Sequence, residues 1–539
     1  MIRSPGLLVL GVILAAAPAD ARRIDAMVPV DPVLGVSLDA TLYVPDVAAP
    51  DGGFPLIVRQ HGGGSNKDST YDVKYALEAV ATGHYAALLY SHRGHGNSGG
   101  IFDFFGPESV ADFSKMIDWV ESAAPEVDTG NVGTNGYSQG GGLSLLPAEH
   151  DARVKAVAVG NTFDSLPHAL NPGDCYKFSW ANGIFLAAYK STASRTRDDL
   201  AARWGLALTA DAQDVATPLT PSANEEMLDH SPITFVDALI ERRVPVFWSN
   251  SWEDQLFPGD HPDVMMRALE EAGVPVHYWF ASGGHAAGPN DPDDEAAKEA
   301  AMLRWFDWHL RGDRAARRWF RSHRVDYAER MPATDTGWVL KTAAAWPLPD
   351  TRPASFHPRA DGTLAMAPDG TEQVGQVLND LANLNVRNDA ILNEIARNVP
   401  GLGDVVQSIP ENGSPLDTRL YTSAPLEADL EFVGAPHLDL AVQSTALRQF
   451  QVSAKLWDVA ADGTARMISR GCISLPGATA AAELPLWPNA HVFAPGHKIA
   501  LAISAVDFPV FAPDKEPQVT AILADTNLTL PTIPKEASE

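Results

Sequence analysis

Short apolar runs alternate with helical patterns from about residue 35 to residue 310. Most of the runs are continuous rather than alternating, which is typical of strands buried on both faces of a parallel sheet. Strands are predicted over residues 36–44, 56–60, 86–92, 131–137, 154–160, 244–250 and 274–280. Helices are predicted between them, over residues 72–82, 107–123, 140–150, 261–272 and 293–310. This alternation predicts a doubly wound, mostly parallel α/β sheet in a catalytic domain of residues 22–340.

The alternation stops between about residues 162 and 243. Helical patterns over residues 182–189, 198–206 and 223–230 replace the strands there. The first part is rich in aromatic residues, namely Tyr176, Phe178, Trp180, Phe185 and Tyr189. Ligands of open α/β sheets bind at the carboxyl edge of the strands, where this insertion would lie. We therefore expect a helical cap that shapes a substrate pocket, although these aromatic residues could equally serve only to pack the cap onto the sheet.

After about residue 340 the hydrophobic pattern changes to short alternating runs such as 438–442 and 451–456, separated by frequent turn signals. Many short strands with regular turns predict an all-β sandwich over residues 341–539. One segment departs from this pattern, because residues 372–399 are rich in Leu, Asn and Ala at helical spacing. We expect a helical insertion there, with a role in packing, dimer contact or the wall of an active site.

A G-x-S-x-G pentapeptide, Gly136-Tyr137-Ser138-Gln139-Gly140, lies between a predicted strand and a predicted helix. A serine on such a strand–turn–helix junction forms a nucleophile elbow, and the glycines leave room for the sharp turn. The pentapeptide alone is a weak signal, and a second copy occurs around Ser98. That copy is not followed by a helical pattern. The context therefore favours Ser138 as the nucleophile of an α/β-hydrolase fold.

A nucleophilic serine needs a base to accept its proton and an acid to orient that base. In this fold the acid and the histidine follow the serine in chain order, each in a loop after a late strand. Asp254 follows the predicted strand 244–250, and His285 follows the predicted strand 274–280. We expect these two residues to complete the triad. The rival acids are Glu253 and Asp260, and the rival histidines are His261 and His309.

The oxyanion of an acyl-transfer reaction needs two hydrogen-bond donors. One is expected to be the backbone N–H of Gln139, directly after the nucleophile. The loop after the strand 56–60 reads His61-Gly62-Gly63-Gly64-Ser65, an HGGG motif as in lipases and esterases, so Gly62 or Gly63 is the expected second donor. His92 and His95 in the next loop have no nearby cysteine or carboxylate at ligand spacing, so we expect no metal and no cofactor.

The net charge and the amino-terminal residues indicate which partners and which cell compartment to expect. The formal net charge of −28 argues against nucleic-acid and anionic-membrane partners, and leaves a small ester or peptide-like molecule as the expected substrate. Residues 1–21 have a basic start, a short apolar run and an Ala-Asp-Ala end, which predicts a secretory signal and a secreted or periplasmic protein. The two cysteines, Cys175 and Cys472, are treated by default as buried thiols, because their pairing is not readable from sequence.

Several motifs together resemble those of the CocE/NonD family of α/β hydrolases, which includes cocaine esterase, α-amino-acid ester hydrolases and X-Pro dipeptidyl-peptidases of the S15 type. The matching segments are residues 91–100, 136–141, 252–258, 284–285, 420–426, 455–459 and 504–509. The resemblance spans nearly all of the chain after the predicted signal. It implies a hydrolase body, a helical cap and a C-terminal jelly roll, with Ser138, Asp254 and His285 as the triad.

One position departs from the family. Its members usually carry a Pro-Tyr pair after the strand that here ends at Gln60, and the tyrosine hydroxyl is the second oxyanion donor. This chain has His61 and three glycines instead, which implies an oxyanion hole made of backbone groups alone. The expected function is cleavage of a carboxylic ester, with an X-Pro-type peptidase or amidase as the alternative. A non-catalytic protein that binds glycan or polymer through the jelly roll is a third, more distant hypothesis.

Overall fold

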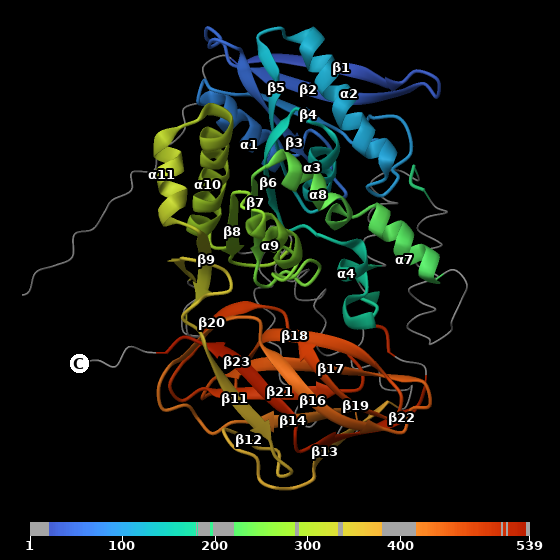
Figure 1. Ribbon diagram of the computed structural model, residues 1–539, viewed down its shortest axis with the longest axis vertical. Coiled ribbons are helices and arrows are strands. Elements are labelled where there is room, and N and C mark those ends of the chain that lie inside the picture. The colour runs from blue at the N-terminus through green and yellow to red at the C-terminus, as the bar shows by residue number, and fades with distance from the viewer. Residues whose placement is uncertain are drawn as a thin grey trace, which may run out of the picture.

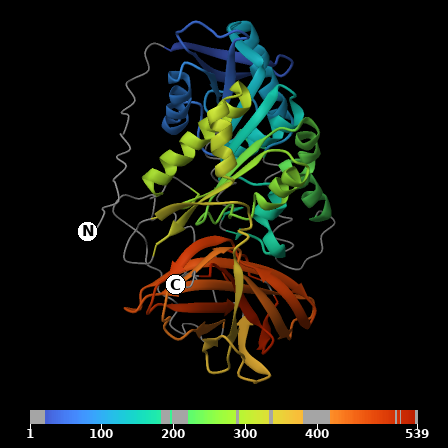
Figure 2. The same ribbon diagram turned by 60° about the vertical axis from the view of Figure 1, so that its left-hand side comes forward.

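The structure, a computed structural model, describes residues 21–178, 180–181, 195–197, 220–285, 290–331, 338–379, 417–507, 510–513 and 516–534. Figures 1 and 2 show an α/β domain stacked on a β domain along the longest axis of the molecule, with α4 (Leu166–Leu170) at the end nearest the β domain. Within the described ranges, no helix has the length and apolar character needed to cross a membrane.

The α/β domain is built on one twisted sheet in the order β1-β2-β4-β3-β5-β6-β7-β8-β9-β10. The strands from β4 to β9 run parallel, while β1, β2 and β10 pair antiparallel at the two edges. Their bounds are β1 Arg22–Asp31, β2 Val36–Val44, β3 Phe54–Gln60, β4 Ala86–Tyr90, β5 Val127–Tyr137, β6 Val154–Gly160, β7 Val246–Ser251, β8 Val276–Ala281, β9 Val325–Arg330 and β10 Trp338–Ala343.

Helices cover both faces of this sheet, as the continuous apolar runs require (Figure 1). Because side chains alternate along a strand, Leu56 and Val58 lie in one core while Ile57 lies in the other. One face is covered by α1 (Thr70–Ala81), α10 (Pro292–Arg311) and α11 (Arg314–Ser322). The other is covered by α2 (Pro107–Ala123), α3 (Gln139–His150), α8 (Val236–Arg242) and α9 (Asp263–Glu271). The predicted doubly wound α/β sheet is thereby confirmed.

Five of the described strands and helices that build or cover this sheet were not predicted, namely β1, β9, β10, α8 and α11, and two of them, β1 and α11, share one reason. Strand β1 (RRIDAMVPVD) is an edge strand with polar and exposed alternate positions, so it carries no continuous apolar run. Helix α11 (RAARRWFRS) buries only Ala316 and Phe320, and its arginines interrupt the apolar pattern in the sequence. Both elements are too polar to be predicted from runs of apolar residues in the sequence.

The predicted cap is described only in part. Its described elements are α4, η1 (Pro172–Asp174), α7 (Thr220–Asp229) and η2 (Pro232–Phe235), and α7 corresponds to the predicted helix 223–230. The predicted helices 182–189 and 198–206, with Phe185 and Tyr189, lie outside the described residues. Buried Tyr176 and Met227 pack with Phe105, Phe163 and Leu146 of the body. For Tyr176 the packing interpretation is therefore the better one.

The C-terminal domain is a sandwich of antiparallel strands around one core (Figure 1). One sheet has the order β14-β21-β17-β18. The facing strands pair as β12–β11–β23, β13–β22–β16–β19 and β15–β20, with β23 also pairing with β15 and β16. The bounds are β11 Arg352–Pro358, β12 Leu364–Ala365, β13 Gln373–Asn379, β14 Thr418–Thr422, β15 Leu430–Gly434, β16 His437–Ser444, β17 Gln449–Val459, β18 Ala465–Pro476, β19 Thr479–Pro485, β20 Asn489–Phe493, β21 Lys498–Ser504, β22 Gln518–Leu523 and β23 Asn527–Thr532.

The helical insertion predicted over residues 372–399 is wrong where the structure describes it. Residues Gln373–Asn379 form β13, which pairs with β22 through an irregularity between Gln373 and Gly375. This bulge lets Val374 and Val377 both face the core although they are three residues apart. The helix prediction rested on Leu, Asn and Ala residues at helical spacing, and most of these lie after Asn379. Residues 380–399 lie outside the described residues.

A disulfide joins the two domains. Cys175, just after η1, is bonded to Cys472 on β18, and the Cα atoms lie 6.0 Å apart. Both residues are buried, and beside them Lys177 Nζ lies 4.8 Å from the ring centre of Trp487. The default interpretation of two separate thiols is therefore wrong. The partners lie 297 residues apart in the sequence, and such a pairing depends on how the domains dock.

Candidate active site

Ser138 lies at the junction of β5 and α3, in the conformation of a nucleophile elbow. Its backbone has φ 55° and ψ −125°, a region that non-glycine residues rarely adopt. A Cβ atom on Gly136 would lie 2.3 Å from the Gly140 carbonyl oxygen, and one on Gly140 would lie 2.2 Å from the Gln60 carbonyl oxygen. Only glycine fits at these two positions, so the G-x-S-x-G spacing follows from the packing of the turn.

Asp254 lies in the loop after β7 and is fully buried. Its Oδ1 accepts hydrogen bonds from the backbone N–H groups of Leu256 and Phe257, each at 2.9 Å. Its Oδ2 accepts a hydrogen bond of 2.8 Å from Nδ1 of His285. The two oxygens thus have separate partners, and the loop itself fixes which one faces the histidine.

His285 lies in the loop after β8 and links the acid to the serine. Its Nε2 lies 3.0 Å from Ser138 Oγ, on the opposite side of the ring from Asp254. Because a carboxylate only accepts, the neutral ring carries its proton on Nδ1, and Nε2 is free to accept the proton of the serine. The structure therefore brings together the three residues that the sequence assigned to the triad.

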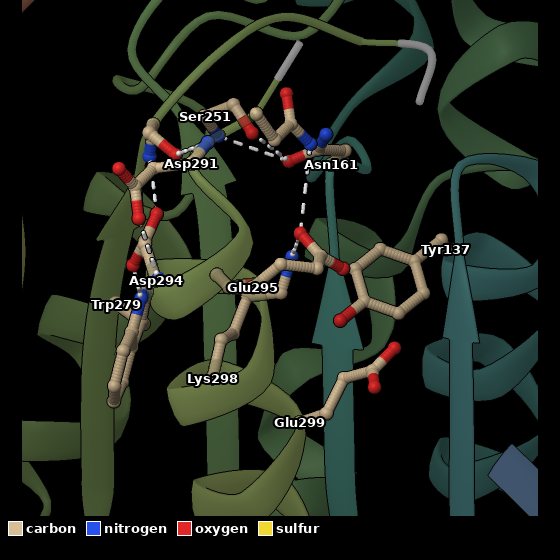
Figure 3. Close-up of polar contacts among 12 residues, drawn as sticks. Tyr137, Asn161, Ser251, Trp279, Asp291, Asp294, Glu295, Lys298 and Glu299 are labelled. Carbon is tan, nitrogen blue, oxygen red and sulfur yellow. Dashed lines mark hydrogen bonds and ion pairs between the residues drawn. The ribbon is translucent and has the colours of Figure 1, made fainter. Parts of the chain in front are cut away.

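The histidine loop is held by Asn161, which sequence reasoning missed. Asn161 follows β6 and has a left-handed backbone, with φ 41°. Its Oδ1 accepts from Ser251 N at 2.9 Å, as Figure 3 shows. Its Nδ2 donates to the Gly284 carbonyl at 3.2 Å. The side chain therefore ties the ends of three neighbouring strands together beside His285. An asparagine directly after a buried strand, where it can adopt this backbone, was the available signal.

The other end of the histidine loop is anchored at the start of α10. Asp294 accepts from Trp279 Nε1 at 3.0 Å and from Ser282 N at 2.6 Å, and it lies beside both Trp279 and Asp291 in Figure 3. Burial raises the pKa of Asp294. Asp291 N in turn donates to Ser282 Oγ at 2.9 Å. Together with Asn161, these bonds fix the backbone on both sides of the part of the loop that carries His285.

The expected oxyanion donors face the same junction. Gln139 is the first residue of α3, where a backbone N–H has no acceptor within the helix. The Gly62 carbonyl accepts from His61 Nδ1 at 2.8 Å and from Ser65 N at 3.3 Å. In a trans peptide the next N–H, that of Gly63, points the opposite way. Among the described residues, neither the Gly63 nor the Gln139 N–H donates a hydrogen bond to another group. The Gly62 N–H likewise has no acceptor in this part of the chain, so Gly62 and Gly63 both stay candidates for the second donor.

The rival residues are engaged elsewhere. Ser98 is buried, and its Oγ lies 2.5 Å from the Ser91 carbonyl and accepts from Asp39 N at 2.9 Å. Glu253 pairs with Arg330 of β9. His309 stacks on Trp308 within α10. Among the residues that the structure describes, Phe257 and Trp180 border His285, with ring centres at 5.2 Å and 6.2 Å from that of the imidazole. Trp180 is thus the described cap aromatic that reaches the site.

The remaining rivals, Asp260 and His261, belong to a buried network at the base of the cap. Asp164 Oδ1 lies 2.8 Å from His261 Nδ1 and 3.2 Å from His168 Nδ1, while His168 Nε2 lies 3.4 Å from Asp260 Oδ2. Two histidines and a carboxylate are a donor set suited to a transition metal. However, these atoms already bond one another, and His168 and the nearby Lys177 balance the two carboxylates. The geometry is that of an ion-pair network.

His168 is the cation of this network. Burial alone lowers the pKa of its ring, but Asp260 and Asp164 raise the pKa to about 10. Burial raises the pKa of Asp260, but His168 holds it well below its ordinary range. The histidine contribution to stability is complete below its unfolded pKa near 6.5 and is lost as the pH rises through 10. The carboxylate contribution is present above about pH 4. The network therefore stabilises most between about pH 4 and 6.5.

Replacing His168 with glutamine is expected to lower the melting temperature by about 5 °C at pH 6, because the buried Asp164 and the half-buried Asp260 lose their cation. The deficit should shrink between pH 6.5 and 10, as the wild-type ring loses its proton. Thermal melts over this range measure it, with His323→Gln as the control, since the His323 ring bonds a backbone carbonyl. A deficit that stays constant with pH would contradict the assignment of charge to His168.

Comparisons with known proteins bear on the whole chain. A family model described as X-Pro dipeptidyl-peptidase (S15 family) matches residues 35–287, and one for the X-Pro dipeptidyl-peptidase C-terminal non-catalytic domain matches residues 318–533. The cocaine esterase of Rhodococcus sp. (strain MB1 Bresler) is 25% identical over 558 residues, which cover 92% of each protein.

Solved structures show the same fold at lower identity. An aminopeptidase from a marine sediment archaeon, Thaumarchaeota archaeon, has a TM-score of 0.72 at 16% identity, covering 96% of this chain and 97% of its own. An α-amino acid ester hydrolase has a TM-score of 0.71 at 16% identity, covering 98% and 100%. A CocE/NonD family hydrolase from Staphylococcus aureus has a TM-score of 0.66 at 14% identity, covering 95% and 94%.

Proposed function

Since the chain belongs to the CocE/NonD family of S15-like serine hydrolases, we propose that it cleaves a carboxylic ester through an acyl-enzyme on Ser138. The observation that carries this proposal is the hydrogen-bonded series from Ser138 Oγ to His285 Nε2 (3.0 Å) and from His285 Nδ1 to Asp254 Oδ2 (2.8 Å). Membership of a hydrolase family also makes the purely binding role, considered from the jelly roll, the weakest of the three hypotheses.

In the proposed reaction Ser138 Oγ attacks the ester carbonyl carbon while His285 Nε2 takes its proton. Asp254 stabilises the imidazolium that forms. The N–H groups of Gln139 and Gly63 bind the negative oxygen of the tetrahedral intermediate. When this intermediate collapses, the imidazolium gives its proton to the leaving alcohol. Water, deprotonated by His285, then attacks the acyl-enzyme and releases the acid.

Two observations favour an ester over an amide. The relative that matches 92% of the chain is named a cocaine esterase. One of the proposed backbone oxyanion donors, Gly63, also lies on an HGGG loop of the kind found in lipases and esterases. Against this stand the family models, whose descriptions name X-Pro dipeptidyl-peptidases, so a peptidase acting through the same triad is the second candidate.

The two candidates are separated by substrate preference. The purified protein is expected to hydrolyse p-nitrophenyl esters of short acyl chains at least about tenfold faster, in kcat/KM, than Xaa-Pro-p-nitroanilides. Both rates are measured by release of the chromophore, with Ser138→Ala as the blank. Fast anilide cleavage with inert esters would overturn the preference for esters and leave the acyl-enzyme intact.

The same proposal includes export from the cytoplasm. It is supported by the signal-like residues 1–21 and by the bond between Cys175 and Cys472, since structural disulfides persist in oxidising compartments. Cell fractionation tests it.

A further inference from the structure

Three buried histidines lie next to the loop of Gly62 and Gly63 and next to the side chain of Gln139. His61 follows β3, while His92 and His95 follow β4, and all three are at most 2% exposed. The His61 and His92 rings stack with their centres 3.8 Å apart, and His95 lies 5.2 Å from His61. We call these three residues the imidazole cluster. It packs the loop of Gly62 and Gly63 against the loop of residues 92–95.

The side chain of Gln139 is bonded to this cluster. Its Nε2 lies 3.0 Å from His92 Nδ1 and 3.3 Å from His95 Nε2. Because an amide nitrogen only donates, both ring nitrogens accept. The remaining ring nitrogens then carry the protons: His92 Nε2 donates to Gln60 Oε1 at 2.8 Å, and His95 Nδ1 donates to the Arg93 carbonyl at 3.1 Å.

His61 completes the network with the same polarity. Its Nε2 accepts from the backbone N–H of His92 at 3.0 Å, and its Nδ1 donates to the Gly62 carbonyl at 2.8 Å. Every ring thus has one donor and one acceptor nitrogen, which is the neutral form. Burial agrees with this, since it lowers the pKa of His61 to about 4 and that of His95 to about 3.

The network reaches both oxyanion donors. It holds the Gly62 carbonyl, whose orientation sets the direction of the Gly63 N–H. It also holds the Gln139 side chain at the residue whose backbone N–H is the other donor. The Gly63 backbone also lies close to the Gln139 side chain, because a Cβ built on Gly63 would be 3.4 Å from Gln139 Oε1.

We propose that the Gln139 side chain and the imidazole cluster are positioning residues of the oxyanion hole, which hold the Gln139 and Gly63 N–H groups in register. The inference rests on the proposed function of Ser138. It predicts an effect on the transition state alone, since the oxyanion forms only there. Within the described part of the chain, none of the four side chains forms a hydrogen bond with Ser138, Asp254 or His285.

The main test replaces Gln139 with methionine, which keeps the length of the side chain but removes its donor. The variant is expected to lower kcat about 10- to 100-fold with little change in KM, because losing a whole oxyanion donor costs about 10²- to 10³-fold. Inhibition by an alkyl boronic acid, which forms a tetrahedral adduct on Ser138, should weaken by the same factor. Rates are expressed per active site titrated with a fluorophosphonate. If Gln139→Met does not fold, His95→Phe is the second test. It removes one acceptor of the Gln139 amide and keeps an aromatic ring beside Phe102, whose ring centre lies 4.8 Å from that of His95. This variant should give a smaller loss of kcat.

A second variant, Gln139→Glu, adds a readout that a merely structural role would not move. A carboxylate facing two accepting nitrogens needs one extra proton, so the ratio of its kcat to that of the wild type should rise as the pH falls from 8 to 5. Among the described residues, the other titratable or charged groups facing the cluster are Tyr90 and Arg195. Neither changes charge in this range, because burial raises the pKa of Tyr90 and a guanidinium stays protonated.

The control is His309→Gln. His309 lies on α10, where its ring stacks on Trp308, so this variant should leave kcat unchanged. Wild-type kcat per titrated site in Gln139→Met, with or without a lower melting temperature, would overturn the proposal. So would a pH-independent ratio for Gln139→Glu. If instead Ser138→Ala retains turnover, it is the proposed function that fails.

Discussion

Replacing Ser138 with alanine is expected to reduce kcat on the order of a millionfold, the loss typical of removing the nucleophile of a triad. The fold should survive, because the substitution removes one hydrogen bond, the one between Ser138 Oγ and His285. The sharp turn depends on Gly136 and Gly140, which are unchanged. The melting temperature is expected to stay within about 2 °C of the wild-type value.

A fluorophosphonate probe measures this prediction directly. It should label the wild-type protein and fail to label Ser138→Ala. The matched control is Ser98→Ala, in the second G-x-S-x-G motif, where the buried Oγ is already bonded to Ser91 and Asp39. That variant should keep its labelling per folded molecule. Labelling that survives in Ser138→Ala would place the nucleophile elsewhere.

Replacing Asp254 with asparagine is expected to lower kcat about 10⁴-fold, as for the orienting acid of other triads. The N–H groups of Leu256 and Phe257 require an oxygen at the Oδ1 position, so the amide nitrogen would take the position that faces His285. The ring would then accept at Nδ1 and carry its proton on Nε2. A protonated Nε2 points a donor at Ser138 Oγ and takes no proton from it.

A neighbouring carboxylate tests this explanation. Glu253→Gln is the matched control, since Glu253 pairs with Arg330 on β9 and should change kcat less than about threefold. Both variants are compared by steady-state kinetics with a p-nitrophenyl ester, normalised to intact protein. Equal losses in the two variants would mean that the loop, and not the carboxylate of Asp254, is what matters.

The positions of the three triad residues along the chain could be predicted, because each residue follows the end of a strand. Ser138, Asp254 and His285 each follow a continuous apolar run, and parallel strands bring their carboxyl ends to one edge. The structure places the three side chains in contact, while their catalytic roles stay predictions for the variants above to test. Helical patterns between these runs predicted α1, α2, α3, α9 and α10, but not α8.

The supporting contacts could not be predicted, because they join residues far apart in the sequence. Asn161 bonds Ser251 and Gly284, and Gln139 bonds His92 and His95, and no local pattern marks such pairs. The helix predicted over residues 372–399 was wrong at its start for the same reason, because pairing with the distant β22 makes a strand of Gln373–Asn379. Sequence periodicity reports which face of an element is buried, and it carries no information on its polar partners.

The bond between Cys175 and Cys472 closes a covalent ring that contains the cap, the loops of Asp254 and His285, and much of the β domain. A single proteolytic cut anywhere within that ring therefore leaves two pieces still joined. On a non-reducing gel such a molecule keeps its full mass, and only a thiol reagent separates the fragments. In a protease-rich extracellular setting, the enzyme would tolerate one nick without losing half of its structure.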